Sequence, residues 1–179
     1  MPIENELKYV LNLEAEQEIK DNALHWRYLK QGYLLKGEQS NLRIRHDNNP
    51  NAVIFQKDYH QICFKQKIND KVIEIENEIS KMDFDELWLI TNIKLEKIRY
   101  TLVQNEEIWV VDAFQYDGTY FLMAEFEMPD GQKEPEFIPE IIFKNLLFPV
   151  PREDARFSSM KLADVEHAKK TYLQLKELK

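Results

Sequence analysis

Hydrophobic and polar side chains alternate along most of the chain up to Met128. A period of two residues is typical of β-strands, because successive side chains point to opposite faces of a sheet. The pattern predicts strands at Ile3–Leu13, Tyr33–Leu35, Asn41–His46, Ala52–Gln56, Gln61–Ile68, Lys71–Ser80, Ile93–Gln104, Ile108–Tyr116 and Tyr120–Met128. Turn-forming pairs such as Asn69-Asp70 and Asp117-Gly118 separate several of these strands.

Helical spacing of apolar residues interrupts this alternation in a few segments. Helices are predicted at Glu14–Lys30, Asp83–Ile90 and Lys161–Leu178, with one further short helix at Pro139–Leu147. Many short strands with few helices indicate a mainly β (α+β) fold, an antiparallel barrel or sandwich with peripheral helices. The chain has 179 residues and no recognisable linker or repeat, so we expect a single domain over residues 1–179.

The formal net charge of the chain is −8 at pH 7. A surface this acidic disfavours nucleic acids and anionic membranes, so neither is expected as a partner. The single cysteine, Cys63, excludes an internal disulfide and a zinc site with several cysteines. The sequence shows neither a signal peptide nor an apolar run of membrane-spanning length, and we expect a cytoplasmic protein.

Charged residues recur at every second position of several predicted strands, and each strand carries mostly one sign of charge. Basic pairs are Arg43 and Arg45, Lys65 and Lys67, and Lys97 and Arg99; acidic pairs are Glu4 and Glu6, Glu74 and Glu76, and Glu125 and Glu127. A solvated face usually mixes the signs, because like charges opposite one another destabilise a sheet. Neighbouring carboxylates suit a hard cation, and neighbouring bases suit a polyanion. The pattern therefore predicts a face that binds a metal–polyphosphate complex.

These residues also carry a family resemblance. The segment Glu4-Asn5-Glu6-Leu7-Lys8 is similar to the E-x-E-x-K signature of the CYTH, or triphosphate tunnel metalloenzyme, superfamily. Further matches follow in the family's order at Gln31-Gly32-Tyr33-Leu34, Arg43-Ile44-Arg45, Lys65-Gln66-Lys67, Glu74-Ile75-Glu76, Glu96-Lys97-Ile98-Arg99-Tyr100, Val111-Asp112-Ala113-Phe114, Ala124-Glu125-Phe126-Glu127 and Arg156-Phe157. The chain departs from the family's usual Arg, Arg and Asn at Lys30, Val72 and Ser159.

The resemblance implies a closed eight-stranded antiparallel β-barrel tunnel that binds a triphosphate with Mg²⁺ or Mn²⁺. By position, the implied metal ligands are Glu4, Glu6, Glu125 and Glu127, with Asp112 contributing to a second site, and Glu74 and Glu76 line the tunnel. The implied phosphate ligands are Lys8, Arg43, Arg45, Lys65, Lys67, Lys97, Arg99 and Arg156. Glu4, Glu6 and Lys8 are the candidate catalytic residues.

The first functional hypothesis is a metal-dependent triphosphate hydrolase acting on inorganic tripolyphosphate. The alternatives are a class IV-type adenylate cyclase, a thiamine triphosphatase and a non-catalytic polyphosphate-binding module. A cyclase must also hold adenine and ribose in line with the α-phosphate, and the sequence shows no comparable base-reading set. Simple anion binding would not require so many carboxylates. The sequence leaves open the choice between hydrolase and cyclase, and between monomer and homodimer.

Overall fold

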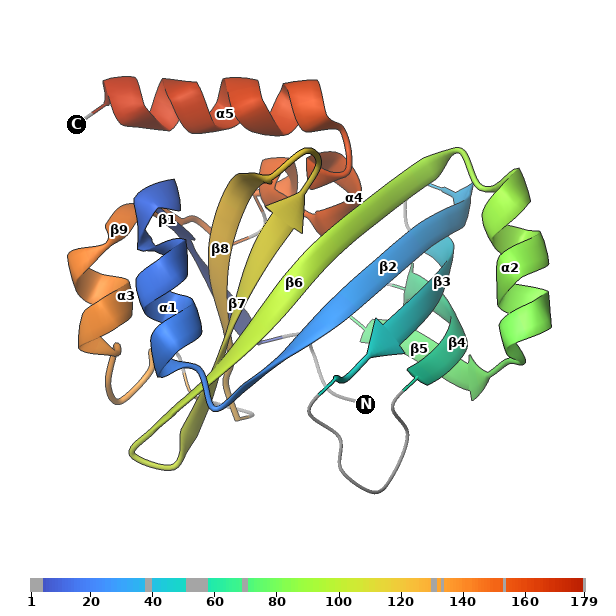
Figure 1. Ribbon diagram of the computed structural model, residues 1–179, viewed down its shortest axis with the longest axis horizontal. Coiled ribbons are helices and arrows are strands. Elements are labelled where there is room, and N and C mark those ends of the chain that lie inside the picture. Colours follow the sequence, from blue (N-terminus) through green and yellow to red (C-terminus); the bar gives the residue numbers. More distant parts are fainter. Residues whose placement is uncertain are drawn as a thin grey trace.

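The computed structural model describes residues 5–37, 40–50, 58–68, 71–129, 132, 134–152 and 154–178, with the backbone alone at Lys67, Lys71 and Val72. The strands are β1 Glu6–Leu11, β2 His25–Lys36, β3 Ser40–Asn48, β4 Asp58–Ile68, β5 Lys71–Glu78, β6 Ile93–Gln104, β7 Glu107–Gln115, β8 Thr119–Glu127 and β9 Leu146–Val150. They form one antiparallel sheet in the order β5-β4-β3-β2-β6-β7-β8-β1-β9 (Figure 1). The predicted mainly β fold with few helices is confirmed, and the predicted strand Ala52–Gln56 lies outside the described residues.

The sheet has nine strands rather than the expected eight, and hydrogen bonds between the described strands do not close it. The edge strands β5 and β9 each pair with a single neighbour. The additional strand is β9, which lies where the helix Pro139–Leu147 was expected to end; the helix there, α3, covers only Glu140–Lys144. Pairing with β1 draws this segment into the sheet, and Pro149 is tolerated there because β9 is an edge strand.

The segment Glu14–Lys30 is only partly helical, in contrast to the prediction. It contains the 3₁₀ turn η1 Leu13–Ala15 and the short helix α1 Glu16–Asn22, after which the chain enters β2 at His25. Tyr28, for example, pairs with Asn48 of β3 and with Ile98 of β6. Pairing on both sides, with aromatic residues that favour strands, therefore overrides the local helical pattern.

The remaining helices are α2 Lys81–Ile90, α4 Ser159–Leu162 and α5 Val165–Glu177, with a 3₁₀ turn η2 Ala155–Phe157 before α4. Helix α2 agrees with the prediction, and Ser80 caps it by accepting a hydrogen bond from the backbone N–H of Asp83. The predicted helix Lys161–Leu178 is divided because Asp164 caps α5, accepting from the N–H of His167. Within the described ranges, no helix combines the length and the apolar character needed to cross a membrane.

The two faces of the curved sheet pack against different helices. On the outer face, a core that includes Trp109, Val111 and Phe126 packs against Ile19 of α1 and Ile142 of α3. Helix α2 covers the outer face further along the sheet, where Phe84 contacts the rings of His46 and His60. A Cβ on Gly32 would lie 2.8 Å from Cγ2 of Thr91, the residue that ends α2, so this position of β2 cannot carry a side chain without displacement.

The inner face changes from apolar to charged along the strands. At one end, a second core joins Leu95 of β6, Phe114 of β7 and Phe121 of β8 to Leu162 of α4 and Tyr172 of α5. Figure 1 shows α4 and α5 lying across this end of the strands. Further along β6 and β8, the same face carries the charged residues Lys97, Arg99, Glu125 and Glu127. The fold thus gives the inner face an apolar end and a charged section.

Candidate functional site

The curvature of the sheet brings charges from distant strands together on the inner face. Burial lowers the pKa of Lys65 on β4, and this shift is opposed by Glu74, Glu76 and also Glu127 on β8. In the sheet, β4 and β8 are separated by β3, β2, β6 and β7. Their side chains can interact only because the sheet bends away from the viewer between β2 and β5 in Figure 1. The charged section is therefore concave.

Asp112 holds two of the bases in the centre of this section. The carboxylate is fully buried; Oδ1 accepts from Nε of Arg99 and Oδ2 from Nη2 of Arg99, both at 2.7 Å, and Lys97 also donates to Oδ2. Although burial acts to raise it, Arg99 and Lys97 hold the pKa of Asp112 well below its usual range. Burial lowers the pKa of Lys97 to about 8 despite the neighbouring carboxylate. Both oxygens of Asp112 are thus occupied by bases.

Opposed carboxylates lie next to this network on β1 and β8. In the register of these strands, Glu6 is directly opposite Glu127, and Lys8 is opposite Glu125. Nζ of Lys8 lies 2.6 Å from Glu6 and 3.9 Å from Glu125. Burial acts to lower the pKa of Lys8. The negative charges of Glu125 and Glu6 outweigh this effect and raise the pKa, so the Lys8 side chain is a cation at neutral pH.

The Glu6–Glu127 pair fits a divalent cation. Like charges directly opposite one another destabilise a sheet; Lys8 offsets the charge of Glu6, and a cation beside Glu127 would remove the remaining repulsion. Burial and, to a smaller extent, the charge of Asp112 raise the pKa of Glu125, although Lys97, Arg99 and Lys8 act to lower it. Carboxylate oxygens are the ligands preferred by Mg²⁺. The predicted ligand Glu4 lies outside the described residues.

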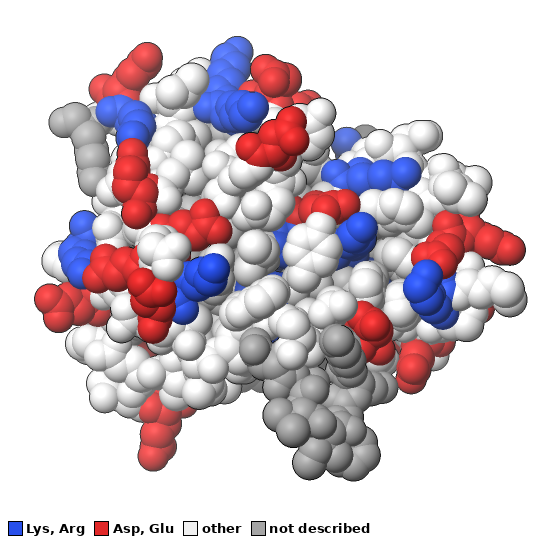
Figure 2. All heavy atoms as spheres, viewed as in Figure 1, with Lys and Arg blue, Asp and Glu red and all other residues white. Residues whose placement is uncertain are grey.

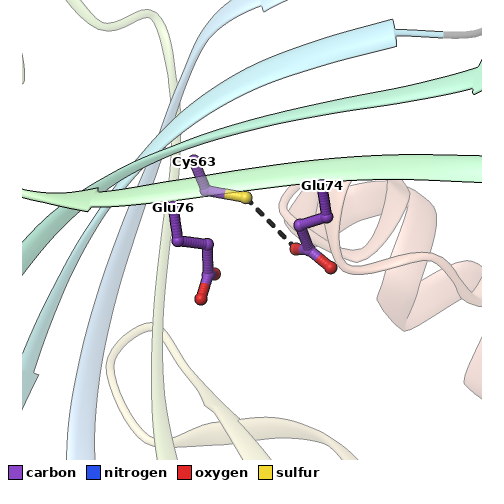
Figure 3. A group of neighbouring side chains, drawn as sticks. All are labelled: Cys63, Glu74 and Glu76. Atoms are coloured by element: carbon purple, nitrogen blue, oxygen red, sulfur yellow. Dashed lines mark hydrogen bonds between the residues drawn. The ribbon is translucent and has the colours of Figure 1, made fainter. Parts of the chain in front are cut away.

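A second acidic group lies across the inner face on β5. Figure 3 shows Cys63 of β4 with Glu74 and Glu76 of β5 on the same side of the two strands. Their potential ligand atoms lie within 4.8 Å of one another, and no other group in the described part of the chain brings three such atoms so close. However, Arg43 already pairs with Glu74 at 3.1 Å and with Glu76 at 3.6 Å. Burial raises the pKa of the Cys63 thiol to about 12, so the protonated thiol is a poor metal ligand at neutral pH.

Arg45 lies beside this group, and part of its hydrogen-bonding capacity is unused. Its buried Nε, like that of Arg43, donates to no described residue. Burial lowers the pKa of Arg45, and the charges of Arg43 and Arg99 lower it further. Three guanidinium groups therefore repel one another on this surface, which is the environment that an anion would stabilise.

The other predicted site residues fall into two groups. The side chain of Lys67 lies outside the described part of the chain. Arg156 is described and lies outside the sheet, in η2, where its half-exposed side chain pairs with Asp154 at 2.7 Å. The charge pattern overlooked Gln31 and Tyr33, which are buried in β2 and pair in register with Arg45 and Arg43. Their alternate positions within the Gln31-Gly32-Tyr33-Leu34 motif could have placed both side chains on one face of the sheet.

Charges on the outside of the molecule are distributed differently. On the face shown in Figure 2, acidic and basic side chains are interspersed. An example of an exposed pair is Lys176 with Glu14, at 3.2 Å. Mixed signs are typical of a solvated surface. The sorting of charge by strand therefore distinguishes the inner face from this surface.

No protein-family model matches the sequence, and no curated protein matches it either. Solved structures do match the fold. The inorganic triphosphatase NE1496 superposes with a TM-score of 0.58 at 22% identity, over 89% of this chain and 97% of the other. A Bacillus halodurans protein whose proposed activity is that of an adenylate cyclase superposes with a TM-score of 0.54 at 19% identity, over 87% and 98% of the two chains. At these identities the likeness shows a shared fold.

Proposed function

We propose that this chain, which has the fold of the CYTH-type proteins, is a divalent-metal-dependent hydrolase of inorganic tripolyphosphate. The observation that carries the proposal is the inner face, where buried bases adjoin the opposed carboxylates Glu6 and Glu127. A polyphosphate has many oxygens for such bases, and its associated cation needs carboxylates. The shared fold with a protein named as an inorganic triphosphatase supports the same reaction.

The bases of the inner face would bind the phosphate groups. They are Lys8, Arg43, Arg45, Lys65, Lys97 and Arg99, with Lys67 and Arg156 as further proposed ligands. Arg45 is well placed for this, because its Nε, like that of Arg43, has no partner in the described chain. Where these bases are partly buried, a charge–charge contact is stronger than in bulk solvent.

Glu6, Glu125 and Glu127 would hold Mg²⁺ or Mn²⁺, together with Glu4 of the same motif. When bound, the ion would polarise a phosphate oxygen and lower the pKa of a bound water. Asp112 would act as a positioning residue, because both of its oxygens already hold Arg99 and Lys97.

The reaction adds water to a terminal phosphorus and breaks its bond to the bridging oxygen, releasing phosphate and pyrophosphate. The chain's own contribution is to hold the three phosphate groups and to neutralise the charge that develops on the leaving group. Lys8 suits this second task, because Glu125 and Glu6 keep it protonated. Glu4 or Glu6 would orient the attacking water.

The proposal is tested by incubating the purified protein with tripolyphosphate and Mg²⁺ or Mn²⁺, with EDTA as the control. We expect metal-dependent release of phosphate and pyrophosphate. Arg45→Ala should lower kcat/KM by about 10- to 150-fold, the loss expected for hydrogen bonds to a charged group. Lys81→Gln, on the outer surface of α2, is the matched control and should retain activity.

The likeness to the Bacillus halodurans protein favours one second candidate, an adenylate cyclase. It is tested by incubation with ATP and Mn²⁺ under the same conditions. Cyclic AMP and pyrophosphate as the main products, with tripolyphosphate left intact, would replace the hydrolase proposal by the cyclase.

A further inference from the structure

Gln31 has a buried side-chain amide without a protein partner. The residue is 1% exposed, and neither Oε1 nor Nε2 makes a hydrogen bond with the described part of the chain. In β2 it pairs in register with Arg45 on one side and with Leu95 on the other. Strand alternation places it on the inner face with these two residues. Because a buried unpaired amide is unfavourable, a group outside the described chain is expected to satisfy it.

A second glutamine in the same row of the sheet provides a comparison. Arg45 pairs in register with Gln31 of β2 and with Gln61 of β4. Gln61 is 5% exposed, and its Nε2 donates to Glu76 at 3.0 Å. Two glutamines of similar burial therefore flank the same arginine, and only Gln61 has a hydrogen-bond partner among the described residues. Of these two glutamines, Gln31 is therefore the one without a hydrogen-bond partner in the described chain.

The position of Gln31 indicates the kind of ligand that it would contact. Arg45 belongs to the charged section of the inner face, whereas Leu95 belongs to the apolar end. An amide N–H can donate to a phosphate oxygen without adding another positive charge to the mutually repelling guanidinium groups of Arg43, Arg45 and Arg99. The amide oxygen can accept from Arg45 or from a water that arrives with the ligand.

We infer that Gln31 is a substrate-binding residue whose Nε2 donates to the phosphate group nearest the apolar end of the inner face. The identity of the ligand rests on the proposed function, but the unpaired amide does not. This assignment adds an uncharged contact to a site otherwise built from charged groups. It also explains why a polar residue occupies a buried position next to Leu95.

The test uses two measurements. The Tm of the ligand-free protein reports its stability, and titration calorimetry reports its affinity for tripolyphosphate, with EDTA present to prevent turnover. Gln31→Leu should raise the Tm, because it removes unpaired buried atoms, and it should weaken tripolyphosphate binding by about 10- to 100-fold. Gln61→Leu is the matched control and should lower the Tm, because Glu76 loses its donor. Gln31→Glu keeps the shape and lies next to Arg45, so it should fold and should bind tripolyphosphate more weakly still.

The outcomes separate this inference from the proposed function. A wild-type protein that neither binds tripolyphosphate in EDTA nor hydrolyses it with Mg²⁺ or Mn²⁺ overturns the proposed function, and the identity of the ligand with it. Normal wild-type binding that is unchanged in Gln31→Leu and Gln31→Glu overturns only the inference. A Tm that falls in Gln31→Leu as it does in Gln61→Leu also overturns it, because the amide would then be satisfied within the folded protein. If Gln31→Leu does not fold, the affinity of Gln31→Glu decides.

Discussion

Replacing Asp112 by Asn tests how much the central ion pairs stabilise the protein. The carboxylate is fully buried, receives two hydrogen bonds from Arg99 at 2.7 Å and pairs with Lys97. Asn keeps the shape but removes the carboxylate that both cations share, and among the described residues Arg99 retains only its contact with Glu125 at 3.2 Å. Removing one partner of a buried ion pair costs about 3–5 kcal/mol. For a chain of 179 residues, we therefore expect the Tm to fall by about 6–20 °C.

Glu14→Gln is the matched control for this change. Glu14 pairs with Lys176 at 3.2 Å, but the two side chains are 73% and 43% exposed. An exposed pair contributes about 0–1 kcal/mol, so the control should change the Tm by no more than about 4 °C. Calorimetric unfolding of both variants at pH 7 gives the comparison. An Asp112→Asn variant that is no less stable than Glu14→Gln would refute the reasoning.

Two further measurements on Asp112→Asn link its stability to the site. Tripolyphosphate in EDTA should raise the Tm of the variant more than that of the wild type, because the phosphates supply the missing counter-charge for Lys97 and Arg99. The pKa of Asp112 is depressed in the folded protein. Its contribution to the free energy of unfolding is therefore present above about pH 3.9, the pKa of an unfolded aspartate, and is lost as the pH falls below that value. The variant should therefore lose less stability than the wild type below about pH 4.

Three other substitutions test separate parts of the structure. Glu127→Gln removes one of the opposed carboxylates, so half-maximal activity should require at least about tenfold more Mg²⁺, and an unchanged metal titration would contradict the assignment. Burial lowers the pKa of Lys97 to about 8, so the affinity for tripolyphosphate should weaken as the pH rises through this value. Binding measured from about pH 7 to 9.5 should lose this pH dependence in Lys97→Arg, because arginine stays protonated over the whole range. Burial and the neighbouring His46 lower the pKa of His60, so the neutral imidazole stabilises the fold above about pH 6.5, the pKa of an unfolded histidine, and this stability is lost as the pH falls. Between about pH 7 and 5, the Tm of His60→Phe should therefore change less than that of the wild type.

Strands with regular alternation could be predicted closely from the sequence. β6 was predicted at its observed bounds, Ile93–Gln104, because apolar and charged residues alternate and a turn follows. The first part of β2 was missed, since its pairing with both neighbours is a tertiary property that a local helical pattern does not show. β9 was missed for a similar reason, because it is a short strand held at the sheet edge by β1.

Parity also predicted which charged side chains share a face, but not which of them pair. Arg45 and Lys65, for example, were expected on one surface, and both interact with the charge of Glu76. The pairing of Asp112 with Lys97 and Arg99 depends on the register between β6 and β7, which alternation within one strand does not define. Gln31 carries no charge, so a charge pattern could not mark it. Its distinguishing property, a buried amide without a partner, exists only in the folded chain.

The apolar end of the inner face has a consequence for longer phosphate polymers. Phe114, Phe121, Phe157 and Leu162 are each at most 1% exposed, so this end is filled with packed side chains. A linear polyanion bound to the bases as proposed would therefore meet packed side chains at this end. Interior linkages of a long polyphosphate could not be seated, and cleavage would be restricted to a chain terminus.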